Sequence, residues 1–162
     1  MRPGRGELLA IAGMMGSGKS TVARHLARAL GRRLVSTDAC VEAIARKPIP
    51  AIFDEDGEAR FRALEREVVL SLRGDLVVDL GGGAFCDAAS AQHLLRAGGV
   101  VFLDVSAAEA ARRIGRGEGR PLAASWETLL ARRLPLYRRA HLVVPVDGLT
   151  PEAVARRILE AP

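Results

Sequence analysis

A glycine-rich segment near the start of the chain has the residue types and spacing that could hold a polyphosphate. Residues 13–20 read GMMGSGKS, which matches G-x-x-x-x-G-K-[ST] at every fixed position. The glycines let consecutive backbone N–H groups converge on phosphate oxygens, the lysine can bridge the β- and γ-phosphates, and the following hydroxyl can ligate Mg²⁺. An apolar run precedes the segment and an amphipathic run follows it, so a strand–loop–helix context is present. The segment predicts that ATP binds through Gly13, Gly16, Ser17, Gly18, Lys19, Ser20 and Thr21.

The lysine of this segment is unusual for the chain. Among 24 lysine and arginine residues, only Lys19 and Lys47 are lysines. A compact ammonium group fits between phosphate oxygens where a planar guanidinium does not. The use of lysine at position 19 therefore favours a phosphate-binding role over a ligand-free glycine-rich turn.

The elements that must position this segment follow from the hydrophobic pattern. Short continuous apolar runs predict buried strands, and a spacing of three and four predicts helices, as at Phe61, Leu64, Val68 and Leu72. Strands that alternate with helices indicate an α/β protein with three α/β/α layers and a five-stranded parallel sheet. The expected strands are residues 7–12, 34–37, 76–80, 100–105 and 142–146. The expected helices are residues 19–30, 38–47, 57–72, 88–97, 107–114, 126–137 and 151–159.

More polar residues lie where strands are expected to end. Asp38 follows the second expected strand, and Asp79 lies near the end of the third. Ligands of such sheets bind beyond the carboxyl ends of the strands, so these residues should lie near the glycine-rich segment. Each also has a structural explanation: Asp38 could cap a helix, and Asp79 could cap the glycine turn after it. The glycines of that turn are Gly81, Gly82 and Gly83.

Composition narrows the class of protein. Apolar residues make up 49% of the 162, which excludes a disordered chain, and no apolar run approaches the ~20 residues that a bilayer span needs. The net charge of +5 suits anionic partners, but the scattered arginines do not favour nucleic acid. Cys40 and Cys86 are too few for a disulfide framework, and Cys40 is read as a small apolar helix residue. We expect a cytoplasmic protein without a membrane or nucleic-acid partner.

Five separated motifs together resemble the shikimate kinase family, within the P-loop kinases related to nucleoside-monophosphate kinases. The motifs are Ser36-Thr37-Asp38, Phe61-Arg62-x-x-Glu65, Gly81-Gly82-Gly83-Ala84, Gly119-Arg120-Pro121-Leu122 and Arg133-x-Pro135-Leu136-Tyr137. Each is weak alone, but the ordered set is specific and extends from about residue 8 to residue 159. The resemblance implies a monomeric kinase of one domain, residues 1–162, with a mobile lid at about residues 115–124. It further implies transfer of the ATP γ-phosphoryl group to the 3-hydroxyl of shikimate, with Mg²⁺ as cofactor, in chorismate and aromatic amino-acid biosynthesis.

The resemblance also implies a role for individual residues. Arg62 and Arg133 would bind the shikimate carboxylate through the planar fork of guanidinium. Asp38 would orient the reacting hydroxyl or accept its proton. Arg120 would stabilise the phosphoryl group in transfer, and Arg113 would stack on the adenine. The glycine triplet would let substrate oxygens approach backbone N–H groups.

Three of these arginines have simpler explanations from the residues alone. Arg133 could lie on a solvated helix face, although Leu129, Leu130 and Leu134 make its helix mostly apolar. Arg62 lies at helical pairing distance from Glu58 and Glu65, as on a solvated helix face. Arg120 lies in a glycine-rich stretch, where a surface loop with a solvated arginine is the ordinary reading. The family pattern favours the functional reading in all three cases.

The chain departs from the family pattern at one acidic position. The family motif is Asp-x-Asp, whereas this chain has Ser36 at the first position, next to the expected Mg²⁺. A serine removes a negative charge that would favour the cation. Asp79 ends an apolar strand as in a Walker B segment, and our hypothesis is that it supplies the missing carboxylate. The alternative, that Asp79 caps the glycine turn, stays open.

Other functions fit part of the pattern. A gluconate or nucleoside-monophosphate kinase would share the phosphate loop, and gluconate also has a carboxylate for Arg62 and Arg133. The glycine triplet and the segment after Arg133 argue against that reading. A nucleotide-binding module without catalysis would account for the basic charge and for Ser36, but not for the complete loop.

Overall fold

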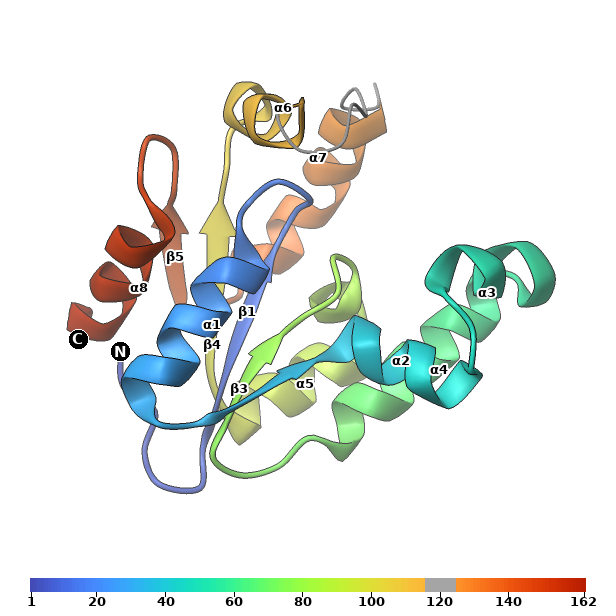
Figure 1. Ribbon diagram of the computed structural model, residues 1–162, viewed down its shortest axis with the longest axis horizontal. Helices are drawn as coiled ribbons and strands as arrows, with labels where there is room; N and C mark the ends of the chain where they lie inside the picture. Colours follow the sequence, from blue (N-terminus) through green and yellow to red (C-terminus); the bar gives the residue numbers. More distant parts are fainter. Residues whose placement is uncertain (116–124) are drawn as a thin grey trace.

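The computed structural model describes residues 1–115 and 125–162, and its centre is a five-stranded parallel sheet (Figure 1). The central strand β1 (Leu8–Gly13) pairs with β3 (Leu76–Asp79) on one side and β4 (Gly98–Asp104) on the other. The outer strands are β2 (Arg33–Ser36), beside β3, and β5 (Leu142–Pro145), beside β4. Every residue of β1 is buried, because helices cover both faces of the sheet.

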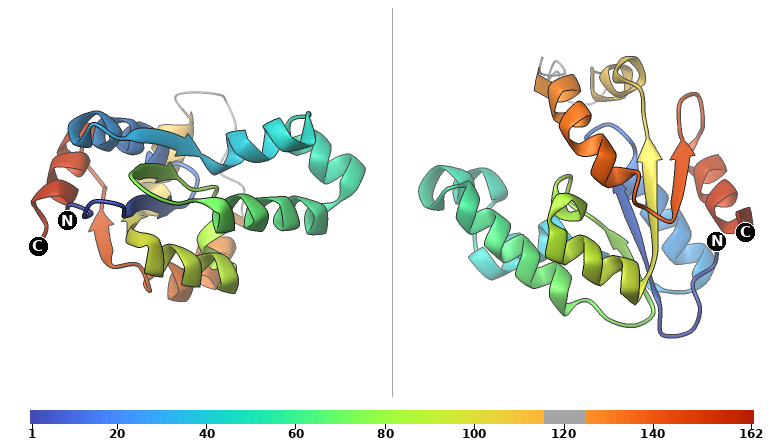
Figure 2. Two further views of the ribbon diagram at one scale, coloured as in Figure 1. Left: turned by 90° about the horizontal axis from the view of Figure 1, so that it is seen from below. Right: turned by 180° about the vertical axis from the view of Figure 1, so that it is seen from behind.

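Helices form a layer on each face of the sheet. On one face, α1 (Lys19–Leu30) packs beside α8 (Pro151–Glu160); α5 (Ala88–Ala97) and α7 (Ser125–Tyr137) lie on the other (Figure 2). The expected three-layer α/β/α fold is confirmed. No helix in the described part of the chain has the length and apolar character needed to cross a membrane.

A helical arm projects from the β2 side of the sheet (Figure 1). It consists of α2 (Thr37–Ala45), α3 (Ile49–Asp56) and α4 (Glu58–Ser71). The arm has a small apolar core of its own, separate from the core around the sheet. Its fully or nearly buried members are Val41, Ile52, Phe61, Leu64 and Val68.

Helix α3 was not expected from the sequence. Its segment contains Pro50, which breaks a helix interior but is tolerated in the first turn, where the backbone N–H groups have no helical partner. Gly57, with φ 85°, then allows the abrupt connection to α4. The other strands and helices agree with the expected ranges to within about two residues at each end.

The remaining elements lie at the end of the sheet where the strands finish. A short 3₁₀ turn, η1 (Ala84–Cys86), follows β3, and α6 (Ala107–Gly115) follows β4. The expected lid, residues 115–124, and Arg120 within it lie outside the described residues, except for Gly115.

Candidate functional site

The phosphate loop connects β1 to α1 and has the backbone conformation that its glycines were expected to supply. Gly16 and Gly18 adopt left-handed conformations with φ 85° and 84°, and Gly18 is the N-cap of α1. The loop therefore presents the N-terminus of α1, where N–H groups without helical partners favour an anion. Lys19 lies in the first turn, and burial lowers its pKa, although Asp79 and Asp38 act in the opposite direction.

A cavity of about 350 Å³ lies over this loop and is the candidate nucleotide site. Among the predicted residues, those that line it are Gly16, Gly18, Lys19, Ser20, Thr21 and Arg113. Gly13 and Ser17 support the loop from below: both are buried, and a β-carbon on Gly13 would lie 3.3 Å from that of Ser17. Gly13 and Ser17 thus contribute to the packing of the loop, not to the lining of the cavity.

Arg113 reaches the phosphate loop from α6. Its guanidinium donates to Glu109 (2.9 Å) and to the backbone carbonyls of Ser17 (3.1 Å) and Val146 (2.9 Å). Bonds from Arg112 and Arg113 lower the pKa of Glu109 to about 2. The edges of the Arg113 guanidinium are therefore engaged, which leaves its flat face for a planar group. Stacking on adenine stays a prediction.

A second cavity, of about 430 Å³, adjoins the first and is the candidate acceptor site. Lys19 and Met15 line both cavities, so the two meet at the phosphate loop. The predicted residues that line the acceptor cavity are Lys19, Asp38, Arg62, Gly82, Gly83 and Arg133. Its apolar walls are formed by Met14, Met15, Ile49, Phe53, Phe61, Trp126 and Leu129. Charged groups that are far apart in the sequence thus line one open cavity with apolar walls.

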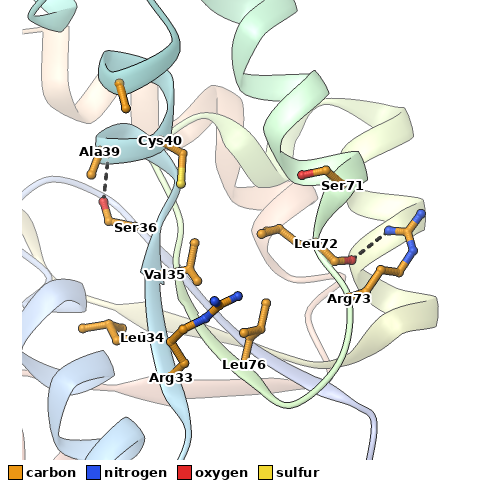
Figure 3. Close-up of a pocket in the computed structure, with 11 residues that line it drawn as sticks. Arg33, Leu34, Val35, Ser36, Ala39, Cys40, Ser71, Leu72, Arg73 and Leu76 are labelled. Carbon is orange, nitrogen blue, oxygen red and sulfur yellow. Dashed lines mark hydrogen bonds between the residues drawn. The ribbon is translucent and has the colours of Figure 1, made fainter. Parts of the chain in front are cut away.

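Asp38 faces this cavity and is not the cap of its helix. The cap is Ser36, whose hydroxyl accepts from the N–H group of Ala39 at 3.2 Å (Figure 3). The expected alternative for Asp38 is therefore wrong. Burial raises the pKa of the Asp38 carboxyl, while the nearby cations Lys19 and Arg62 oppose that rise.

Arg62 forms ion pairs on its own helix but still faces the cavity. It donates to Glu65 at 2.7 Å and lies 3.6 Å from Glu58, as the helical spacing predicted. Glu65 is only 3% exposed, and its Oε2 atom has no hydrogen-bond partner among the described residues. Burial raises the pKa of Glu65, and Arg62 opposes the rise. The arginine is thus held against a buried carboxylate, unlike one on a solvated helix face.

Glu65 is a site residue that the sequence reasoning did not select. It appeared in the motif with Arg62, but only as a possible surface pairing partner. Its burial could have been inferred, because Phe61, Leu64 and Val68 surround it on the apolar face of α4. A glutamate on such a face is rare unless it has a partner.

The glycine triplet also makes room for charged side chains, and the expected approach of substrate oxygens to its N–H groups stays a prediction for Gly82 and Gly83, which line the cavity. The N–H group of Gly81 donates to Thr37 Oγ1 at 2.8 Å and is therefore already engaged. A β-carbon on Gly81 would lie 2.8 Å from Glu65 Oε2 and closer still to Asp38. A β-carbon on Gly83 would lie 2.9 Å from the guanidinium carbon of Arg62. None of these glycines has a positive φ, so they make room for charged side chains.

Arg133 comes to the cavity from the other side, on α7. Its guanidinium donates to Met14 Sδ at 3.9 Å. One turn later, Tyr137 is buried, donates to the backbone carbonyl of Gly82 and has its pKa raised by burial to about 12. Tyr137 thus ties α7 to the glycine triplet, which places Arg133 across the cavity from α4.

Asp79, the last residue of β3, is hydrogen-bonded to the phosphate loop. Ser20 Oγ donates to Asp79 Oδ2 at 2.6 Å. Asp79 is also the register partner of Ser36 across the parallel pair β2–β3. The alternative in which Asp79 only caps the glycine turn does not fit, because Gly81 N–H bonds to Thr37 instead.

A larger cavity of about 590 Å³ lies at the β2 edge of the sheet, with Ser36 in its lining (Figure 3). Its lining is mainly apolar, from β2, α2 and the end of α4, with the guanidinium of Arg33 directed into it. None of the predicted site residues lines this cavity. Cys40 lines it and also packs against the small core of the arm, in agreement with its reading as a small apolar residue.

Comparison with known proteins decides the family. The model of the family described as "SKI: Shikimate kinase" matches residues 15–161. The chain belongs to the shikimate kinase family. It is accordingly an ATP-dependent kinase with an alcohol group as acceptor, and the alternative of a module without catalysis loses its basis.

Individual shikimate kinases resemble the chain over nearly its full length. The enzyme of Mycobacterium ulcerans is 42% identical over 92% of this chain and 85% of its own. That of Rhodococcus erythropolis is 40% identical over 91% of this chain and 92% of its own. The solved shikimate kinase of Acinetobacter baumannii, in complex with shikimate, superposes with a TM-score of 0.86 and 34% identity, covering 95% of this chain and 91% of the other.

Proposed function

We propose that this chain transfers the γ-phosphoryl group of ATP to the 3-hydroxyl group of shikimate, with ADP and shikimate 3-phosphate as products. The observation that carries the proposal is the junction of two cavities at Lys19, one over the phosphate loop and one lined by Asp38, Arg62 and Arg133. Shikimate has one carboxylate and three ring hydroxyls on an apolar ring. The acceptor cavity offers cations, a carboxylate and apolar walls to match.

Arg62 and Arg133 are proposed to bind the carboxylate of shikimate. They belong to α4 and α7, on different sides of the glycine triplet, and both line the acceptor cavity. Glu65 holds one edge of the Arg62 guanidinium and leaves others for the substrate. Glu65 is therefore a positioning residue for Arg62.

Asp38 is proposed to accept hydrogen bonds from substrate hydroxyls and to take the proton of the attacking oxygen. Its raised pKa makes it a better proton acceptor than an ordinary aspartate. Lys19 lies between the cavities, where an ammonium group stabilises charge on the phosphoryl group in transfer. Arg120 is proposed to act on the same group, and Arg113 to stack on adenine.

The residues beside the phosphate loop fit a magnesium ion. Ser20 and Asp79 present a hydroxyl and a carboxylate, 2.6 Å apart, and oxygen ligands are those that Mg²⁺ prefers. When bound, the ion would neutralise phosphate charge and shield the phosphoryl group from repulsion of the nucleophile. We propose that Ser20 ligates Mg²⁺ and that Asp79 replaces the carboxylate that Ser36 lacks.

The register of β2 and β3 suggests a test of this replacement. The variant Asp79→Asn should bind Mg²⁺·ADP more weakly and require more Mg²⁺, while its affinity for shikimate stays within about twofold. Adding Ser36→Asp returns a carboxylate to the adjacent position in the sheet and should restore part of the loss. Metal titrations followed by ADP binding measure both effects. An unchanged Mg²⁺ requirement in Asp79→Asn would contradict the assignment.

The remaining proposals concern organisation. We propose one kinase domain, residues 1–162, whose lid at about residues 115–124 closes over ATP. The chain would act as a cytoplasmic monomer with ATP and shikimate as its partners and no nucleic acid or membrane. Family resemblance supports these points, and sedimentation with and without substrates tests the oligomeric state.

The experiment that tests the function is ADP release with Mg²⁺·ATP and a panel of acceptors. Shikimate should support turnover, whereas gluconate and nucleoside monophosphates should not. Gluconate is the sharpest competitor because it also offers a carboxylate to Arg62 and Arg133. Absence of shikimate-dependent turnover, or faster turnover with gluconate, would refute the proposal.

A further inference from the structure

A tryptophan connects the wall of the acceptor cavity to the phosphate loop. Trp126 lies in the first turn of α7 and is only 4% exposed. Its indole N–H donates to the backbone carbonyl of Met15 at 3.1 Å, across 111 residues of sequence. A buried indole N–H needs an acceptor, so this bond fixes both the orientation of the ring and the position of the loop carbonyl.

The two partners of this bond touch both ligand cavities. Trp126 lines the acceptor cavity, and Met15 lines the acceptor and the nucleotide cavities. A substrate that packs against the indole therefore contacts a side chain whose other end holds the phosphate loop. A nucleotide that fixes the loop also fixes the Met15 carbonyl, which accepts the indole hydrogen bond.

The phosphate loop is a segment for which such a restraint matters. Met15 lies directly before Gly16, which adopts a left-handed conformation and has no side chain to anchor the backbone. Met15 as a whole is 65% exposed, and α7 anchors it through its backbone carbonyl. Fixing this carbonyl reduces the conformational freedom that nucleotide binding would otherwise have to remove.

We infer that Trp126 is a positioning residue that couples the two sites, so that each ligand binds more tightly when the other is present. The inference rests on the proposed function, because it takes the two cavities as the shikimate and ATP sites. The coupling is carried by one neutral hydrogen bond and by the ring that it orients. A bond of this kind changes an equilibrium by about twofold to tenfold, which sets the expected size of the coupling.

The test is the variant Trp126→Phe, which keeps an aromatic wall but has no N–H group. Calorimetric titration gives the Kd of ADP with and without saturating shikimate, and the Kd of shikimate with and without ADP. In the unmodified chain, both ratios should exceed one and should be equal, as linkage requires. In Trp126→Phe, both ratios should fall toward one. Each ratio compares the variant with itself, so a change in the Kd of shikimate alone does not affect the comparison.

A matched control separates coupling from damage to the cavity wall. Leu129 lies one turn further along α7 and lines the same cavity through apolar atoms. Leu129→Ala should weaken shikimate binding but leave the coupling ratio unchanged. Equal loss of coupling in both variants, or an unchanged ratio in Trp126→Phe, would overturn the inference. Thermal unfolding of each variant verifies that the ratio is measured on folded protein.

Fluorescence offers an independent measurement, because Trp126 is the only tryptophan of the 162 residues. Its emission should respond to ADP alone, through Met15, and to shikimate alone, through the ring. No response to ADP in a protein that binds ADP would count against the inference. Failure of the unmodified chain to bind shikimate would instead refute the proposed function, so the two failures are distinguishable.

Discussion

The variant Gly81→Ala should show whether the glycine triplet is needed for side-chain packing or for backbone conformational freedom. Gly81 has no positive φ, so alanine imposes no backbone strain there, and its N–H bond to Thr37 can remain. The new β-carbon would nevertheless lie 2.8 Å from Glu65 Oε2 and nearer still to Asp38. The change therefore acts on the two acidic side chains of the acceptor site.

The size of the effect follows from these distances. Ordinary contacts with a β-carbon begin near 3.4 Å, so Glu65 Oε2 at 2.8 Å must retreat by at least 0.6 Å. Asp38 must move further, by about 1 Å, and a displacement of that order at a reacting group lowers a rate by roughly 10²-fold. We expect kcat of Gly81→Ala to fall by about that factor. The Kd of ADP should change little, because the nucleotide cavity is lined by other residues.

The other two glycines provide matched variants. In Gly83→Ala, the methyl group meets Arg62, so the main effect should be a rise in the KM for shikimate. In Gly82→Ala the new β-carbon lies 3.3 Å from Arg133, which needs to move by only a few tenths of an ångström. Both kcat and the KM for shikimate should therefore change by less than about fivefold. Steady-state kinetics on the three variants, with thermal unfolding as the folding control, tests the series. If Gly81→Ala keeps a kcat within threefold of the parent, or if all three variants behave alike, the packing argument fails.

Two further predictions concern pH. In the free enzyme, kcat/KM should fall at low pH with a midpoint above the pKa of an ordinary aspartate, because burial raises the pKa of Asp38. It should also fall at high pH with a midpoint below the pKa of an ordinary lysine, because burial lowers the pKa of Lys19. A profile recorded between about pH 4 and pH 10 measures both midpoints, and an acid limb that persists unchanged in the residual activity of Asp38→Asn would contradict the assignment. Hydrogen bonds from Arg66 lower the pKa of Asp87 to about 2 from 3.8, so this pair stabilises the fold above about pH 4 and the contribution is lost as pH falls toward 2. Urea unfolding at about pH 6 and pH 3 should show a smaller acid-induced loss for Asp87→Asn than for the parent, and an equal loss in both would refute the linkage.

The sequence predicted the sheet well because the signal for a buried parallel strand is local. Runs such as residues 76–78 are apolar without interruption, and an acidic residue, a glycine or a helix-starting residue marks their ends. Helix α3 was not predicted because it contains Pro50 and three acidic residues among eight, and Ile52 is its one fully buried residue. Its stability comes from the arm that it completes, which no local window of sequence contains.

The site was predicted unevenly, for physical reasons. The phosphate loop follows from local chemistry, since its conformation and its ligand groups lie in eight consecutive residues. The role of Ser36 as the helix cap was missed, because Asp38 is an equally good cap on composition and only the helix start at Thr37 decides between them. Trp126 was missed as a site residue because its role depends on a contact between distant segments, whereas the apolar face of α4 around Glu65 was a local signal that was not used.

We propose that Ser36 and Asp79, two departures from the family pattern, compensate for each other. Taken alone, Ser36 reads as a lost metal-binding carboxylate and therefore as weakened catalysis. Ser36 and Asp79 are register partners on adjacent parallel strands, which lie about 4.8 Å apart. A carboxylate moved by one strand spacing stays within reach of a cation that keeps several of its waters. The hydrogen bond from Ser20 directs Asp79 toward the phosphate loop. Under the proposed assignment of Asp79 to Mg²⁺, the negative charge near the metal is therefore relocated within the sheet and not removed.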